Sequence, residues 1–121
     1  MLEGIIAQHD QAFHLSYIEV SGGRLAISLK SAPIGKTVRV RIEARDVSLA
    51  LQPPQRSSIT NVLPARVLDV TADRDPAQRL IRLQVGGKPL LARITLRSVQ
   101  QLAIAPGLQL YAQIKSAALM E

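Results

Sequence analysis

The chain has 121 residues, enough for one domain or two very small ones. It is 47% hydrophobic and 20% charged, has no cysteine, and contains no stretch near the ~18 apolar residues of a membrane span, which excludes a disulfide scaffold, a thiolate metal site and a transmembrane helix. The net charge of +6 is uneven: residues 1–52 carry six basic and five acidic side chains and residues 53–121 carry nine and four, so an anion is expected to meet the second part.

The first half of the chain is a series of short apolar runs with period-two alternation, which predicts strands rather than helices. These strands are expected at Glu3–Gln8, Phe13–Val20, Arg24–Leu29, Thr37–Glu43 and Asp46–Gln52. His9-Asp10-Gln11 and Ser21-Gly22-Gly23 are the predicted turns of the first two hairpins. Pro53-Pro54 ends the last strand, because proline cannot continue a ladder, and predicts a boundary between domains 1–52 and 53–121.

The second half continues the same pattern and adds one helix. Strands are expected at Ser57–Asp73, Arg79–Val85, Lys88–Thr95 and Leu108–Lys115, joined by turns such as Gly86-Gly87. Leu96–Leu102 is the one predicted helix, with Thr95 as its N-cap. The predicted fold class is all-β: an OB-fold-like small barrel over residues 53–121 with a short helix at one end, preceded by short strands that complete the barrel or pack on it.

Three patterns typical of catalysis or metal binding are each incomplete or absent in the sequence. Gly35-Lys36-Thr37 lacks the first glycine of a phosphate-binding loop and precedes a strand instead of a helix. His9 and His14 are the only histidines and are expected to be surface residues, since a metal site needs three or four ligands. No G-x-S-x-G nucleophile motif occurs. We therefore expect neither an enzyme active site nor a metal site in this chain.

Small polar side chains gather where predicted strands begin or end. Ser58, Thr60 and Asn61 open the strand at SSITNVLPARV, and Lys115 and Ser116 close the strand at LYAQIKSAAL. Hydroxyls, backbone N–H groups and an ammonium are the donors of a small-anion site. The same residues are also ordinary at strand ends, so the pattern alone leaves both interpretations open.

The same two stretches resemble the Mop family of molybdate-binding domains. SSITNVLPARV resembles the family's opening Thr/Ser-Ser-Ala-Arg-Asn motif, LYAQIKSA its closing strand, and ARITLRSVQQLAIAPG the segment between them. VRVRIEARDVSLALQPP resembles the strand pair that precedes this domain in the ATP-binding subunits of molybdate ABC transporters. The resemblance implies that Ser58, Thr60, Lys115 and Ser116 of one barrel and Thr95 and Ser98 of another bind a molybdate or tungstate oxyanion, with Thr60 in place of the family's arginine.

By this resemblance the chain is a regulatory C-terminal region of such a subunit, without its ATPase domain and without a cofactor of its own. Its implied partners are a second copy in a homodimer, the ATPase domain and, through it, the membrane subunit, on the cytoplasmic face of the inner membrane. Two alternatives remain: a dimerisation scaffold without an anion site, and a single-strand nucleic-acid barrel. The last is disfavoured because the only aromatic residues, Phe13, Tyr17 and Tyr111, make a poor stacking platform, so no nucleic-acid partner is expected.

Overall fold

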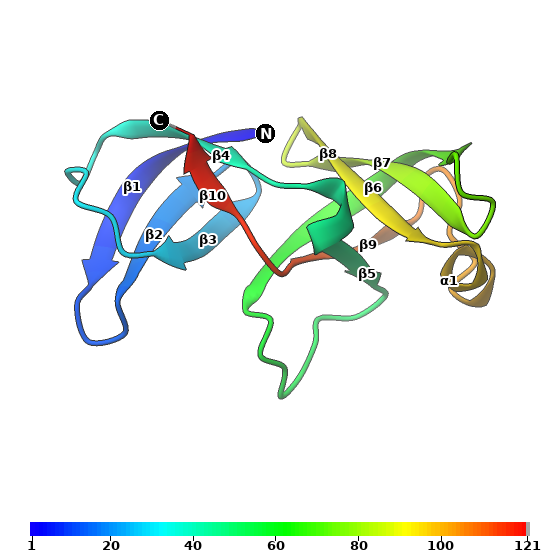
Figure 1. Cartoon of the computed structure of the whole chain (residues 1–121), viewed down its shortest axis with the longest axis horizontal. Helices are drawn as coiled ribbons and strands as arrows, with labels where there is room; N and C mark the ends of the chain where they lie inside the picture. Colours follow the sequence, from blue (N-terminus) through cyan, green and yellow to red (C-terminus); the bar gives the residue numbers. More distant parts are fainter. Residues whose placement is uncertain (121) are drawn as a thin grey trace.

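The computed structural model describes residues 1–120, which form two five-stranded antiparallel sheets that lie side by side as two lobes (Figure 1). Lobe 1 contains β1 (Leu2–Asp10), β2 (Leu15–Val20), β3 (Gly23–Ser28), β4 (Thr37–Arg41) and β10 (Ala118–Met120). Lobe 2 contains β5 (Val47–Ala50), β6 (Asn61–Ala72), β7 (Gln78–Val85), β8 (Lys88–Thr95) and β9 (Gln109–Ile114), with the helix α1 (Leu96–Gln101) after β8. The all-β prediction with one short α-helix is confirmed for these residues.

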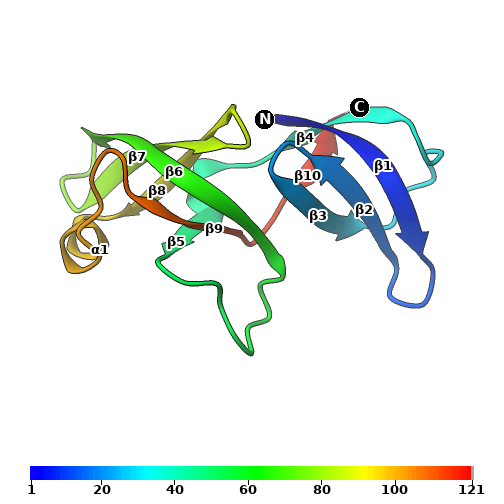
Figure 2. The same ribbon diagram turned by 180° about the vertical axis from the view of Figure 1, so that it is seen from behind.

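The two sheets share one topology. The strand orders are β10-β4-β1-β2-β3 and β5-β9-β6-β7-β8, so in each lobe three consecutive strands form a meander and the fourth pairs with the first. The fifth, outermost strand is exchanged between the lobes. β5 follows β4 along the chain but pairs with β9 of lobe 2, whereas β10 follows β9 but pairs with β4 of lobe 1. Figure 2 shows the two connections crossing between the lobes.

The likeness extends to details of the backbone. The pairing of β1 with β2 shifts between Ile6 and Gln8, and that of β6 with β7 shifts between Val67 and Asp69, so both long strands carry a bulge at the matching position. Gly35 and Gly107, both at φ +92°, turn the chain into the fourth strand of their lobes. Their N–H groups donate to the carbonyls of Ile6 and Val67 at 2.7 and 2.8 Å. A side chain with a Cβ would be strained at either glycine.

The predicted alternation places the core correctly. In β4, Val38 and Val40 are buried while Arg39 and Arg41 are exposed, and in β9 the buried residues are Leu110, Ala112 and Ile114. The inner faces of both sheets form one hydrophobic cluster. This burial is the main stabilising contribution to the fold.

Several predicted boundaries are wrong. A 3-10 helix, η1 (Ala44–Asp46), stands where we predicted the beginning of a strand at Asp46, and the first hairpin turns at residues 11–14 rather than 9–11. β10 was not predicted. Sheet membership changes at η1, upstream of Pro53, while the division into domains 1–52 and 53–121 stays a prediction.

The lobes are joined by side-chain contacts as well as by the exchanged strands. The Asn61 amide at the start of β6 accepts from the Ala26 N–H and donates to the Ala26 carbonyl, both at 2.8 Å. It therefore occupies hydrogen-bonding groups of β3, the edge strand of lobe 1. Nearby, the Ser21 hydroxyl donates to the Gly86 carbonyl, so the β2–β3 turn packs against the β7–β8 turn.

Candidate functional site

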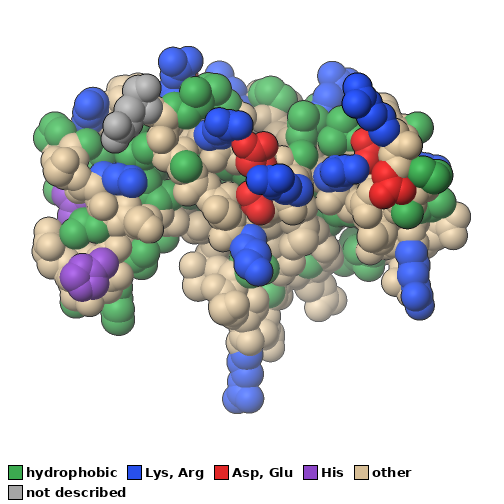
Figure 3. Space-filling view, viewed as in Figure 1, with side chains coloured by type: hydrophobic (Ala, Val, Ile, Leu, Met, Phe, Trp, Pro, Cys, Tyr) green, Lys and Arg blue, Asp and Glu red, His purple; other side chains and the backbone are tan. Residues whose placement is uncertain are grey.

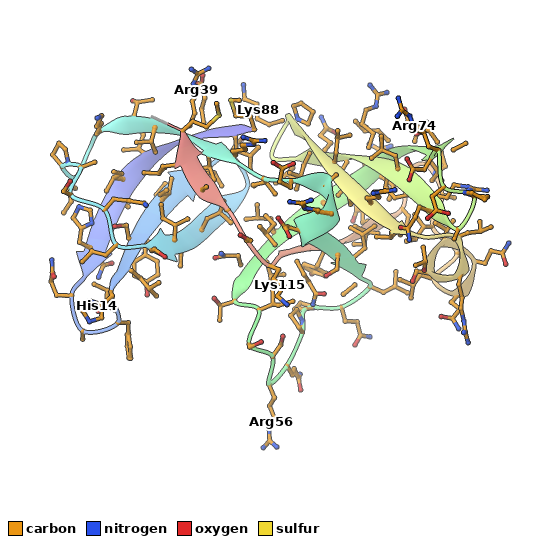
Figure 4. All side chains as sticks on the ribbon, viewed as in Figure 1. His14, Arg39, Arg56, Arg74, Lys88 and Lys115 are labelled. Carbon is orange, nitrogen blue, oxygen red and sulfur yellow. The ribbon has the colours of Figure 1, made fainter. Side chains whose placement is uncertain are left out.

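The structure brings Thr60 and Lys115 to the same end of the β6–β9 ladder. Asn61 pairs with Ile114 at the end of the ladder. Thr60 comes directly before Asn61, and Lys115 comes directly after Ile114. The Lys115 N–H donates to the Asp46 carbonyl at 2.8 Å, which fixes the backbone as it leaves β9. Figure 4 shows Lys115 at the junction of the two lobes. The strand register therefore places the backbone of both residues at this end of the ladder, directly outside β6 and β9.

Two of the three predicted serines, Ser58 and Ser116, flank this pair in sequence. Ser116 follows Lys115 and is exposed, at the rim of a pocket of about 210 Å³ that is also lined by Arg41 and Glu43. Ser58 is exposed in the segment that leads into β6. Four of the six predicted site residues thus come from two adjoining segments at the lobe junction, where they are accessible to a solute.

The other two predicted residues lie at the opposite end of lobe 2, where Thr95 is the N-cap of α1 and Ser98 is within α1 (Figure 1). The Thr95 Oγ1 atom accepts a hydrogen bond from the Ser98 N–H at 3.1 Å, which confirms the predicted N-cap. The same oxygen donates to the Ser98 hydroxyl at 2.9 Å. One chain therefore does not bring all six predicted residues together.

Sequence reasoning missed Arg24 as a residue of this region. Arg24 lies on β3 of lobe 1 and lines a pocket of about 290 Å³ together with Thr60 and Asn61 of lobe 2. Period-two alternation in RLAISL places Arg24 on the outer face, opposite the buried Leu25, but no local pattern indicates which segment meets that face. The signal is the long-range pairing of Asn61 with β3.

The expectation of two surface histidines is wrong for His9. Its Nε2–H donates to the Ala32 carbonyl at 2.8 Å, and its Nδ1 accepts from the Ser16 hydroxyl at 2.8 Å. Ser16 is fully buried and its oxygen also accepts from the Lys30 N–H at 2.9 Å. His9 therefore anchors the loop after β3, whereas His14 is exposed in the β1–β2 turn.

Figure 3 shows Lys and Arg side chains scattered over the surface, with acidic side chains next to some of them at the centre and the right of the view. The Arg93 side chain hydrogen-bonds to Asp73, which lowers the pKa of that carboxyl, outside the lobe junction. Within residues 1–120 no group of three or more His, Asp or Glu side chains is placed to hold a metal ion. No helix in this part of the chain has the length and apolarity needed to cross a membrane.

Comparison with known proteins gives several relatives. The chain is 46% identical over all of its 121 residues to the molybdenum import ATP-binding protein ModC of Hahella chejuensis, and 50% identical over the same length to ModC 2 of Azotobacter vinelandii. It spans only 34% of the length of either relative.

A solved structure of the cytoplasmic molybdate-binding protein ModG with molybdate bound superposes with a TM-score of 0.79, covering 98% of this chain and 92% of that one at 24% identity. This likeness shows that the two proteins share a fold, in which both lobes are included. The profile of the TOBE domain matches residues 57–120, which include all six predicted site residues. The chain therefore belongs to the TOBE domain family.

Proposed function

We propose that this chain is a regulatory region of the ATP-binding subunit of a molybdate importer and binds molybdate or tungstate at the lobe junction. The observation that carries the proposal is the position of Thr60 and Lys115, each next to the last residue pair of the β6–β9 ladder, with Ser116 following Lys115 in sequence. The proposal is supported by relatives named molybdenum import ATP-binding proteins and by the shared fold of a molybdate-binding protein.

The donors at this junction suit a tetrahedral dianion. Removing such an ion from water is costly unless each oxygen receives a hydrogen bond. The Lys115 ammonium supplies charge, and the hydroxyls of Ser58, Thr60 and Ser116 supply neutral donors. Donors fixed by backbone register select an anion by size and geometry, while a surplus of cations would accept any anion.

The complete site requires a second chain in this proposal. Thr95 and Ser98 lie at the far end of lobe 2 from Lys115, so they reach an anion there only if they come from a neighbouring copy. A two-fold homodimer satisfies this geometry twice, because each copy offers one junction and one α1 end.

We place the homodimer in the transporter, at the cytoplasmic face of the inner membrane. There it would contact the ATPase domain of the same subunit and, through it, the membrane subunit. The chain corresponds to about a third of its ATP-binding relatives, and the proposed role of that third is to bind the oxyanion and modulate transport, not to catalyse hydrolysis.

Calorimetric titration with molybdate tests this function. Lys115→Ala is expected to weaken binding by one to two decades, because a charge-assisted hydrogen bond to a dianion contributes roughly 1.5–3 kcal/mol. Thr60→Arg should tighten binding by adding a cation beside the lysine. Lys88→Ala, at the exposed first residue of β8, is the matched control and should leave affinity unchanged. Equal affinities in all four proteins would rule out this site.

A dimerisation scaffold without an anion site is the second candidate, favoured by the neutral Thr60 at a position where the Mop-family motif has arginine. Analytical ultracentrifugation distinguishes the two. A dimer that forms fully without molybdate and shows no heat of binding is the result expected of a scaffold. A dimer that tightens with molybdate is expected of the oxyanion-binding domain, because the anion bridges the two chains.

A further inference from the structure

The pocket beside Thr60 is built by both lobes. Its volume is about 290 Å³, several times the ~30 Å³ that one water molecule occupies in the liquid, so it can hold a tetrahedral oxyanion with some of its waters. Lobe 2 contributes Thr60 and Asn61. Lobe 1 contributes the remaining lining, Leu15, Tyr17, Arg24 and Ala26. Arg24 is the one cationic side chain among these lining residues.

Arg24 is held in place by two neighbours on its own sheet. Its Nε and Nη2 atoms contact the same oxygen of Glu19 at 2.7 and 2.5 Å, and its guanidinium lies 5.6 Å from the centre of the Tyr17 ring. Both contacts to Glu19 end on one carboxylate oxygen, so the other N–H groups of the guanidinium remain for another acceptor. The side chains of Arg24 and Glu19 are 48% and 50% exposed, so a dissolved anion can reach them.

We infer that Arg24 is a second cation of the oxyanion site and that Glu19 competes with the anion for it. This inference rests on the proposed function. Lys115 follows Ile114, the partner of Asn61 on β9, whereas Arg24 lines the pocket of Thr60 and Asn61 from β3 of lobe 1. Two cations balance a dianion, and the planar guanidinium fork matches two oxygens of a tetrahedral ion. Glu19 neutralises Arg24 in the unliganded protein and repels the incoming anion, so it lowers the affinity for the oxyanion.

The test uses two substitutions with opposite expected signs. Arg24→Gln is expected to weaken molybdate binding about tenfold, near the lower end for a charge-assisted hydrogen bond because the residue is half exposed. Glu19→Gln is expected to tighten binding by roughly threefold or more, since it removes both the competitor and a repelling charge. Raising the salt concentration should shrink both effects.

Matched controls come from the Arg82–Asp69 ion pair of lobe 2, whose Nη2 and Oδ2 atoms lie 2.7 Å apart and whose side chains are 57% and 38% exposed. Neither residue lines the pocket, so Arg82→Gln and Asp69→Asn should leave molybdate affinity unchanged. Unchanged circular dichroism and melting temperature would show that all four variants fold.

The outcomes separate this inference from the proposed function. Opposite shifts for Arg24→Gln and Glu19→Gln with silent controls support it. If Lys115→Ala weakens binding while both lobe 1 variants bind like the wild type, Arg24 is a surface residue and the proposed site stands without it. If Arg24→Gln and Arg82→Gln change molybdate affinity equally, the effect comes from the protein's net charge, and the inference about Arg24 is wrong. Absence of binding in every protein, wild type included, overturns the inference and the proposed function together.

Discussion

Lobe 1 and lobe 2 are two versions of one fold with different chemistry at matching positions. Lys115 and Ser116 of lobe 2 come eight and nine residues after Gly107, and the residues at the same distance from Gly35 are Glu43 and Ala44. Lobe 1 therefore has an acid and a methyl group where lobe 2 has the proposed anion donors. The backbone arrangement is kept without them, so the donors of lobe 2 are not needed to build the sheet.

The lobes also differ at the end of the sheet that is closed by a helix in lobe 2 and by a loop in lobe 1. His9 and Ser16 pair across β1 and β2, and the matching pair of lobe 2 is Val70 and Ile81. The helix α1 closes lobe 2 with apolar side chains, whereas a loop hydrogen-bonded to His9 closes lobe 1. The comparison teaches that one topology tolerates either a polar or an apolar closure, provided that each buried polar group has a partner.

Truncation of the matched core leucines is expected to have the largest effect. Leu2 and Leu63 face Val40 and Ala112 in their sheets and are 1% and 0% exposed. Leu→Ala at either position should lower the free energy of unfolding by about 2–5 kcal/mol, through lost burial and a cavity. Because the lobes exchange strands and share one core, each variant should still unfold in a single urea transition. Two separate transitions would mean that the lobes fold independently.

Substitution at the packed turns should come next. A Cβ at Gly86 would lie 2.4 Å from the Gly22 nitrogen across the lobe junction, whereas one at Gly87 meets nothing within 4 Å. Both glycines have positive φ, so both Gly→Ala variants incur about 1 kcal/mol of backbone strain. Gly86→Ala should cost roughly 1–3 kcal/mol more because of the clash. Similar melting temperatures for the two variants would show that the turns are free to move apart.

The polar closure of lobe 1 predicts a smaller loss. Ser16→Ala removes the partner of the His9 ring and of the Lys30 N–H, which should lower stability by about 1–3 kcal/mol. Ser48→Ala is the matched control, because that exposed hydroxyl bonds the Gln113 side chain and its loss should change stability by less than about 0.5 kcal/mol. Chemical denaturation measures the free energy of unfolding of both variants. Equal values would show that the hydrogen bonds of Ser16 do not stabilise the fold.

The smallest effect is expected from an ion pair found only in lobe 2. Arg93 lowers the pKa of Asp73 below its ordinary value of 3.8, and the matching position of lobe 1 is Ser28. Because the folded-state pKa is depressed, this contribution is present above the ordinary pKa and is lost as pH falls through the folded-state value. Arg93→Gln should therefore slightly lower the melting temperature at pH 7 and have less effect at pH 2–3. A larger effect in acid would contradict the assignment.

Local patterns predicted much of the fold and little of its assembly. The alternation of β4 and β9, the Gly86-Gly87 turn and the Thr95 cap were all readable, because each depends on a few neighbouring residues. The sequence did not predict which sheet β5 and β10 join, because pairing partners are set by long-range contacts and β10 has only three residues. The proposed donors at Thr60 and Lys115 were predicted from a motif, while the proposal for Arg24 depended on the contact between Asn61 and β3.

The exchange of β5 and β10 also determines the order in which the protein can be completed. Lobe 2 receives its outer strand from residues 47–50, made before the rest of its sheet, and lobe 1 receives its own from residues 118–120, made after every other strand. During synthesis lobe 1 therefore keeps an open edge until residues 118–120 are made, although β1–β4 are made before lobe 2. Pairings that distant in sequence slow folding, because the chain must close a long loop before the contact forms. We expect that residues 1–43 alone would lack the fifth strand of their sheet, whereas residues 44–115 contain all five strands of lobe 2.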